Sequence, residues 1–155
     1  MQSRTLVQPA QLLVRFGLGT AFLSAVADRF GLWGPPGTAG VAWGDFEHFT
    51  GYTRTITWFL PVVLTPLLAW LATMGEALFG VLLLLGYRTR ESALGSTALL
   101  STFALSMTVS SPGLHGVFTY SVLSAAGGAF LLANVPDPIW SLDALLRSVK
   151  VESEA

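Results

Sequence analysis

The chain has 155 residues, a length typical of one domain, and is 52% hydrophobic but only 11% charged. Soluble domains carry about 25% charged residues, so this composition excludes an ordinary soluble globule as well as a disordered chain. The net charge of −1 and the lack of a basic patch exclude nucleic acid as a partner, and the absence of cysteine excludes thiol redox chemistry by the chain itself. The remaining class is an integral membrane protein.

Four apolar stretches are long enough to cross a bilayer, for which a helix needs about 20 residues. A helix satisfies its own backbone hydrogen bonds in lipid, whereas a spanning barrel needs at least about eight strands. We therefore predict an all-α fold, a single membrane domain over residues 1–155 built as a four-helix bundle. The predicted spans are residues 10–27, 65–86, 92–110 and 117–135.

The first stretch also has features of a cleaved signal peptide. Arg4 precedes the apolar run, and Ala25, Val26 and Ala27 follow it in the pattern of a cleavage site. Arg15 inside the run argues against this interpretation, because the apolar region of a signal peptide is uncharged. We therefore interpret the stretch as the first span.

Two segments outside the spans are predicted to lie at the membrane surfaces. Residues 40–57 mix aromatic and charged side chains, which predicts an extracytoplasmic interfacial helix or a cap over the bundle. Residues 141–149 place leucines and a valine on one helical face, which predicts a short amphipathic helix along the inner membrane surface.

The basic residues predict the orientation of the chain. If both termini are cytoplasmic, five basic residues lie inside and two lie outside, and cytoplasmic loops prefer lysine and arginine. The inside set is Arg4, Arg88, Arg90, Arg147 and Lys150, and the outside set is Arg29 and Arg54.

Glu76 and Arg15 are the strongest candidates for a functional pair. Glu76 would lie about 15 Å from the inner end of its span and Arg15 about 9 Å from the inner end of the first span. Ionisable groups at such depths are rare and costly, so the two side chains are predicted to pair. The pair would serve as a proton relay or an anchor for a bound head group, or it would only fix the register of the helices.

Four other residues are candidate ligand contacts. Asp28 and Arg29 end the first span, where they are either solvated helix-end charges or close the top of a bundle pocket together with Arg54 and the aromatic outer loop. Tyr87 lies at the inner end of the second span beside two arginines, which we interpret as orientation signals and lipid phosphate contacts.

No metal site is predicted. His48 and His115 both fall on the outer side, but neither belongs to a spaced metal-binding motif, so we interpret them as ordinary loop histidines. A phosphate-binding glycine loop, a nucleophile elbow and a zinc-binding helix are also absent from the sequence.

Three segments together resemble the DoxX family. LLVRFGLGTAFLSAVADRFG (12–31) is similar to the first helix of that family, although Arg29 stands where a lysine is common. Residues 71–95 resemble the second helix, with the matching positions at Gly75, Glu76, Gly86 and Arg90, and WSLDALL (140–146) resembles the closing motif. The histidine-rich loop of some members is missing here, apart from His115.

The resemblance implies a four-helix protein of the bacterial or archaeal cytoplasmic membrane. Relatives include subunits of thiosulfate:quinone oxidoreductase, and others are described in redox assemblies with superoxide dismutase and a sulfurtransferase. It therefore implies a membrane subunit of a redox complex, an oxidoreductase subunit in which quinone is the candidate ligand and a partner protein or bound cofactor supplies electrons.

Two other functions stay open. The chain could be a non-catalytic scaffold, anchor or assembly factor for a partner protein. Its expected partners are the lipid bilayer and either a redox partner protein or further copies of the chain in a homo-oligomer. A small-solute transporter is a weaker alternative, because four helices are few for alternating access and no inverted repeat is visible.

Overall fold

The structure is a computed structural model that describes residues 2–110, 113–136 and 139–153. Its regular elements are all helical in these residues, which confirms the predicted all-α class. The elements are α1 (Gln2–Arg29), α2 (Phe46–Ile56), the 3₁₀ turn η1 (Val62–Leu64), α3 (Thr65–Leu85), α4 (Thr89–Thr108), α5 (Gly113–Thr119), α6 (Val122–Ala133) and α7 (Leu142–Ser153).

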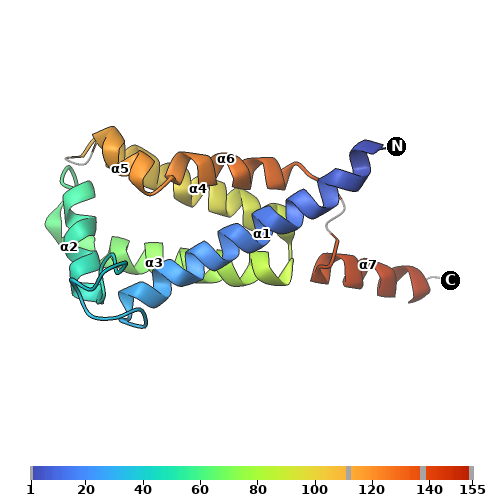
Figure 1. The fold of residues 1–155 in the computed structure, drawn as a ribbon, viewed down its shortest axis with the longest axis horizontal. Helices are drawn as coiled ribbons and strands as arrows, with labels where there is room; N and C mark the ends of the chain where they lie inside the picture. Colours follow the sequence, from blue (N-terminus) through green and yellow to red (C-terminus); the bar gives the residue numbers. More distant parts are fainter. Residues whose placement is uncertain (1, 111–112, 137–138, 154–155) are drawn as a thin grey trace.

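Four helices form an elongated bundle (Figure 1). α1 packs on α3, α3 on α4, α4 on α6, and α6 packs back on α1. The short helix α2 and the loop before it cover one end of the bundle, while both chain termini lie at the other end. The segment predicted as a cap and the two termini are therefore at opposite ends.

A glycine contact sets the crossing of α1 and α3. A Cβ atom built on Gly19 would lie 3.0 Å from the carbonyl oxygen of Gly80, and one built on Gly80 would lie 3.2 Å from the carbonyl oxygen of Gly19. Small residues let helix backbones approach closely in membrane bundles, where hydrophobic sorting contributes little. This contact fixes which residues of α1 and α3 face each other.

A second pair of glycines brings α3 and α4 together between the middle of α3 and the turn that connects the two helices. A Cβ atom at Gly95 would lie 2.4 Å from the ring of Phe79, and one at Gly75 would lie 3.2 Å from Leu99. The turn itself passes through Gly86, whose φ of 64° is left-handed and ends α3 without the steric cost of a side chain.

The fourth predicted span, residues 117–135, is not one continuous helix. Ser121 has a left-handed φ of 51° and separates α5 from α6. The break turns the chain so that the ring of Tyr120 stacks on Trp43 at 6.1 Å. α6 alone has 12 residues, about 18 Å of helix, so two helices rather than one occupy the residues of this predicted span.

Two helical segments in the described residues are long and apolar enough to cross a membrane, Leu6–Arg29 and Val62–Leu85. α4 has 20 residues but is rich in serine and threonine. Large apolar side chains nevertheless cover the outside of the bundle, as expected of a surface that faces lipid. Several of these side chains have more than half of their surface exposed, among them Leu13, Leu67, Met74, Leu78, Leu105, Phe130 and Leu131.

Arg15 fastens the C-terminal segment to the end of α3 near the termini. Its side chain is fully buried, and its Nε donates to the carbonyl oxygen of Leu83 at 3.0 Å. Its Nη1 donates to the carbonyl oxygens of Ile139 at 2.9 Å and Trp140 at 3.3 Å. Hydrogen bonds from a charged donor contribute about 1.5–3 kcal/mol each, so this contact is a strong one.

Asp143 caps α4 from the far end of the chain. Its two carboxylate oxygens each accept from a backbone N–H, of Arg88 and of Thr89, both at 2.7 Å. Burial alone would raise the pKa of this carboxyl, but the N–H donors of Thr89 and Arg88 outweigh burial and lower the pKa below 3.8. The closing motif thus stabilises a helix N-terminus.

α7 is amphipathic, as predicted, but does not lie across the end of the bundle. It continues outward, roughly along the long axis of the bundle (Figure 1). A helix flat on a membrane that the bundle crosses would run across this axis instead. The contacts of Asp143 fix the first turn of α7 beneath the α3–α4 turn, and the remainder projects from there.

The Asp143 cap should make stability depend on pH. Because the folded-state pKa is lowered, the stabilisation is fully present above the unfolded-state pKa and is lost as the pH falls through the folded-state value. Asp143→Asn should therefore unfold at a lower temperature than the native chain at neutral pH, and the difference should shrink below pH 3.8. Thermal unfolding in detergent at a series of pH values measures this. A difference that stays constant with pH would show that the charge of Asp143 does not matter.

Candidate functional site

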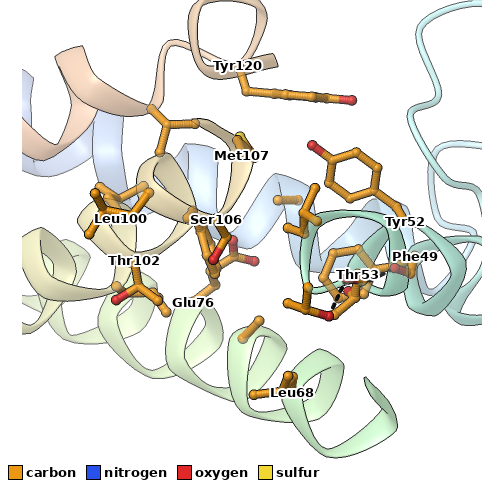
Figure 2. Close-up of a pocket in the computed structure, with 18 of the residues that line it drawn as sticks. Phe49, Tyr52, Thr53, Leu68, Glu76, Leu100, Thr102, Ser106, Met107 and Tyr120 are labelled. Carbon is orange, nitrogen blue, oxygen red and sulfur yellow. Dashed lines mark hydrogen bonds between the residues drawn. The ribbon is translucent and has the colours of Figure 1, made fainter. Parts of the chain in front are cut away.

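A cavity of about 900 Å³ lies inside the bundle, near the end that α2 covers. Figure 2 shows side chains from α2, α3, α4 and Tyr120 around it, and α1 completes the wall. Most of the lining is apolar or aromatic. The lining side chains that carry a charge or a hydroxyl are Arg29, Tyr52, Thr53, Thr57, Glu76, Thr102, Ser106 and Tyr120.

Arg29 and Glu76 form a buried ion pair in the wall of this cavity. The Nη2 of Arg29 lies 2.6 Å from Oε2 of Glu76, and the two residues are 2% and 4% exposed. Nη1 of Arg29 donates to the hydroxyl of Thr73 at 2.9 Å, and this hydroxyl donates in turn to the carbonyl oxygen of Ala69. The pair therefore joins the end of α1 to the middle of α3.

Aromatic rings complete the surroundings of Arg29. The guanidinium carbon lies 3.6 Å from the ring centre of Phe49, which belongs to α2, and 5.4 Å from that of Trp43. A cation over an aromatic face gains about 2 kcal/mol when both are removed from water. Arg29 thus connects α1, α2 and α3, and its Nε is left without a hydrogen-bond partner in the described residues.

The predicted pairing of Arg15 with Glu76 was wrong. Gly19 faces Gly80 across the helix contact. Arg15 precedes Gly19 by four residues, toward the end with the termini, whereas Glu76 precedes Gly80 by four residues, toward the α2 end. At 1.5 Å per residue these two offsets place the side chains about 12 Å apart along the bundle. The residue that reaches Glu76 is Arg29, one of the predicted ligand contacts.

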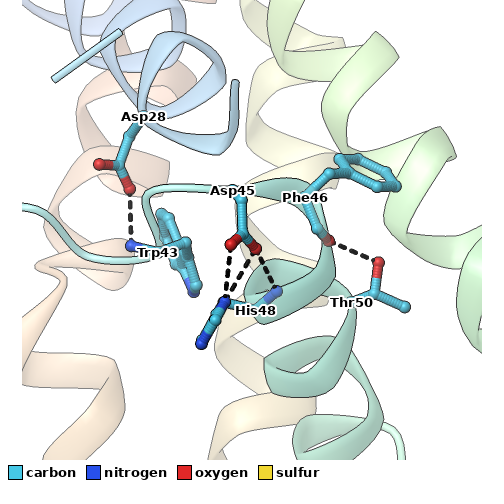
Figure 3. A network of polar contacts seen from close by, with 6 residues as sticks. All are labelled: Asp28, Trp43, Asp45, Phe46, His48 and Thr50. Atoms are coloured by element: carbon cyan, nitrogen blue, oxygen red, sulfur yellow. Dashed lines mark hydrogen bonds and ion pairs between the residues drawn. The ribbon is translucent and has the colours of Figure 1, made fainter. Parts of the chain in front are cut away.

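The loop before α2 places Trp43 in the wall. Asp28, 4% exposed, accepts the backbone N–H of Trp43 at 2.8 Å (Figure 3). Asp45 caps α2 by accepting the backbone N–H of His48 at 2.8 Å, and it also contacts the His48 ring. The backbone and side-chain hydrogen bonds from His48 lower the pKa of the Asp45 carboxyl. Asp28 therefore positions the loop, and the adjacent Arg29 lines the cavity.

α2 presents Phe49, Tyr52, Thr53 and Ile56 to the cavity. The hydroxyl of Tyr52 is buried and has no hydrogen-bond partner in the described part of the chain. Burial, together with the nearby Tyr120, raises the pKa of Tyr52 to about 12. The hydroxyl therefore stays protonated at neutral pH and is a donor without a partner in the described residues.

The structure brings only some of the predicted ligand contacts together. Arg29 lines the cavity, and Asp28 supports it through Trp43. Arg54 donates to the carbonyl oxygen of Leu60 at 3.1 Å and lines a smaller neighbouring pocket. Tyr87 lies in the α3–α4 turn and is not part of the cavity wall.

The aromatic outer loop was one predicted part of a bundle pocket, but its individual rings were not identified from the sequence. Trp43, Phe46, Phe49 and Tyr52 recur at every third residue, a spacing that places the three α2 members near one face of a short helix. Three of the four rings line the cavity, so this spacing could have pointed to its wall, whereas Phe46 packs against Phe30 and Trp70. The contact of Trp43 with Tyr120 could not have been found in this way, because it depends on the break at Ser121.

A helical bundle with an apolar outer surface, apolar helices of spanning length and an internal apolar cavity defines a class of small helical membrane proteins. A family model described as DoxX matches residues 10–110, and the chain belongs to the DoxX family. No curated protein and no solved structure matched the chain. The match covers the residues of the ion pair but not Tyr120 or the closing motif.

The ion pair should show strong coupling in a double-mutant cycle. Glu76→Leu or Arg29→Leu alone leaves one buried charge uncompensated, which should lower the free energy of unfolding by about 3–5 kcal/mol, and the double variant should recover much of that loss. Denaturant titration in mixed micelles measures these values.

A matched cycle with Arg15→Leu in place of Arg29→Leu is the control. Its two losses should add, because Arg15 and Glu76 do not share a partner. Coupling between Arg15 and Glu76, or additive losses for Arg29 and Glu76, would contradict the observed pairing.

Proposed function

We propose that this protein is a multi-pass protein of the cytoplasmic (inner) membrane that holds a quinone-like lipid in its cavity and acts as the membrane subunit of a redox complex. The observation that carries the proposal is the cavity of about 900 Å³ that is apolar except for a buried ion pair and a few hydroxyls. Ligand sites of about 300–1,000 Å³ with mostly apolar walls and few polar groups are typical of small-molecule and cofactor binding.

The polar groups suit a ring that carries oxygen acceptors. The Tyr52 hydroxyl is an unused donor, and Arg29 keeps one N–H without a partner in the described residues. Carbonyl oxygens of a quinone accept hydrogen bonds, and its isoprenoid tail would match the leucine-rich walls. Glu76 lies beside Arg29, so it is the residue placed to exchange a proton with a ligand.

The quinone, when bound, would supply the redox chemistry. The chain has no cysteine, so electrons must come from a partner protein or from a bound cofactor. The residues of the chain would bind the ligand, orient it and keep water from it.

The arrangement of the helices supports a membrane bundle in which α1, α3, α4 and the α5–α6 pair cross the bilayer. α4 is about 30 Å long, which equals the thickness of the hydrocarbon core. Arg29 is buried and ion-paired, so of the two basic residues predicted outside only Arg54 remains at the α2 end. The excess of basic residues at the other end favours cytoplasmic termini.

Reporter fusions test this orientation. A reporter inserted at residue 38, in the loop before α2, should report the extracytoplasmic side, and one at the C-terminus should report the cytoplasm. The bundle places these two positions at opposite ends, so signals from the same side would contradict both the orientation and the membrane-crossing bundle (Figure 1).

If the protein is instead a scaffold or assembly factor, different molecules should co-purify with it in mild detergent. A scaffold should return a stable partner protein and no bound lipid in the cavity, whereas the proposed subunit should return quinone by mass spectrometry. Recovery of a partner without quinone would favour the scaffold.

Tyr52 gives the sharpest test of ligand binding. An azidoquinone should label peptides of the cavity wall when the full chain is reconstituted in liposomes. Tyr52→Phe removes one hydrogen bond, worth about 0.5–1.5 kcal/mol, and should lower the affinity about 2- to 10-fold. Its thermal stability should not fall, because the hydroxyl has no partner in the described residues.

Tyr87→Phe is the matched control, since Tyr87 does not line the cavity. It should bind the azidoquinone like the native chain. Labelling confined to the outer surface, or equal affinity in both tyrosine variants, would argue against the cavity as the binding site.

A further inference from the structure

The cavity has a mouth on the side of the bundle, between α3 and α4. Several of its lining residues are also exposed. On the two facing helices these include Leu71 of α3 at 55%, Leu105 of α4 at 69%, and Thr102 of α4. Trp58 and Val109, which contact each other at one edge of the opening, are exposed as well. Side chains that line a cavity and face outward at the same time mark where it meets the exterior. α3 and α4 thus form the two sides of the opening.

Two contacts between neighbouring segments mark the two ends of this mouth. Toward the α3–α4 turn, the close approach of Gly75 and Leu99 brings the two helices together. At the other edge, the Trp58 Nε1 donates to the carbonyl oxygen of Val109 at 3.1 Å, which ties the loop after α2 across the end of α4. The opening therefore lies between two fixed contacts.

The surroundings of the mouth are apolar. Leu67, Leu71 and Leu105 are each more than half exposed on the adjoining helices. In a membrane bundle such a surface faces hydrocarbon, because exposed leucine on this scale is unfavourable in water. At the α2 end, by contrast, the ring of Tyr120 covers the cavity. It stacks on Trp43, and its ring centre lies 6.0 Å from that of Tyr52.

We infer that the ligand enters the cavity sideways from the bilayer, through the mouth between α3 and α4. This inference rests on the proposed function and narrows its ligand to a molecule dissolved in the membrane, rather than a solute that arrives from water. Such a ligand would pass Leu71 and Leu105 with its ring leading, reach the Arg29–Glu76 pair, and leave its tail in the mouth among the lipids.

The absence of cysteine allows a clean test by order of addition. Thr102→Cys in the full chain, reconstituted in liposomes, carries one reactive thiol at the mouth, and a bulky maleimide attached there should obstruct it. If the maleimide is added before the azidoquinone, labelling of the cavity wall should drop several-fold. If the azidoquinone is added first, labelling should be retained and should resist competition by unlabelled quinone.

Ala98→Cys is the matched control, one turn away on the exposed surface of α4 and outside the cavity lining. Its conjugate should give the same yield in both orders. Equal yields in both orders for Thr102→Cys, whether high or low, would overturn the lateral mouth. No labelling of the unconjugated chain would instead refute the proposed function, and this inference with it.

Discussion

The fold around the cavity depends on the burial of Arg29. A guanidinium removed from water is stable only where other groups replace its hydration, and here a carboxylate, a hydroxyl and an aromatic face do so. These groups come from α3 and α2, so the charge of one residue fixes three elements relative to one another. The same arrangement leaves a charged and partly unsatisfied surface in an otherwise apolar wall, which is the chemical basis of a site.

A second buried arginine organises the opposite end by different means. Within the part of the chain that the structure describes, Arg15 has no carboxylate partner at hydrogen-bond distance. It donates there to backbone carbonyl oxygens at the end of α3 and in the segment before α7. The α3 carbonyls of Leu83 and Leu84 carry the partial negative charge of a helix C-terminus. One arginine therefore belongs to the cavity, while the other ties the chain end to the bundle, and exchanging their partners would break both contacts.

Much of the fold could be predicted from the sequence, because apolar run lengths and turn residues are local signals. The bounds of α3, the position of α4 to within three residues, a helix within residues 40–57 and an amphipathic C-terminal helix all follow from them. The partner of Glu76 could not, since it depends on the register of α1 against α3, which the Gly19–Gly80 contact sets. Depth estimates from each helix end placed Arg15 about 6 Å from Glu76, whereas the register separates them by about 12 Å.

The position of the cavity follows from where glycine allows α3 and α4 to touch. Gly95 accepts the ring of Phe79, and Gly75 lies against Leu99, so the helices are close from their turn up to this level. Above it the α3 wall continues with Leu68 and Leu71, and the space between the helices becomes part of the cavity. Glu76 directly follows Gly75 in the sequence, next to the edge of the opening that the Gly75–Leu99 contact forms. Two adjacent residues thus have different roles. Gly75 allows the close contact of α3 with α4, and Glu76 places a charge at the cavity that begins beside this contact.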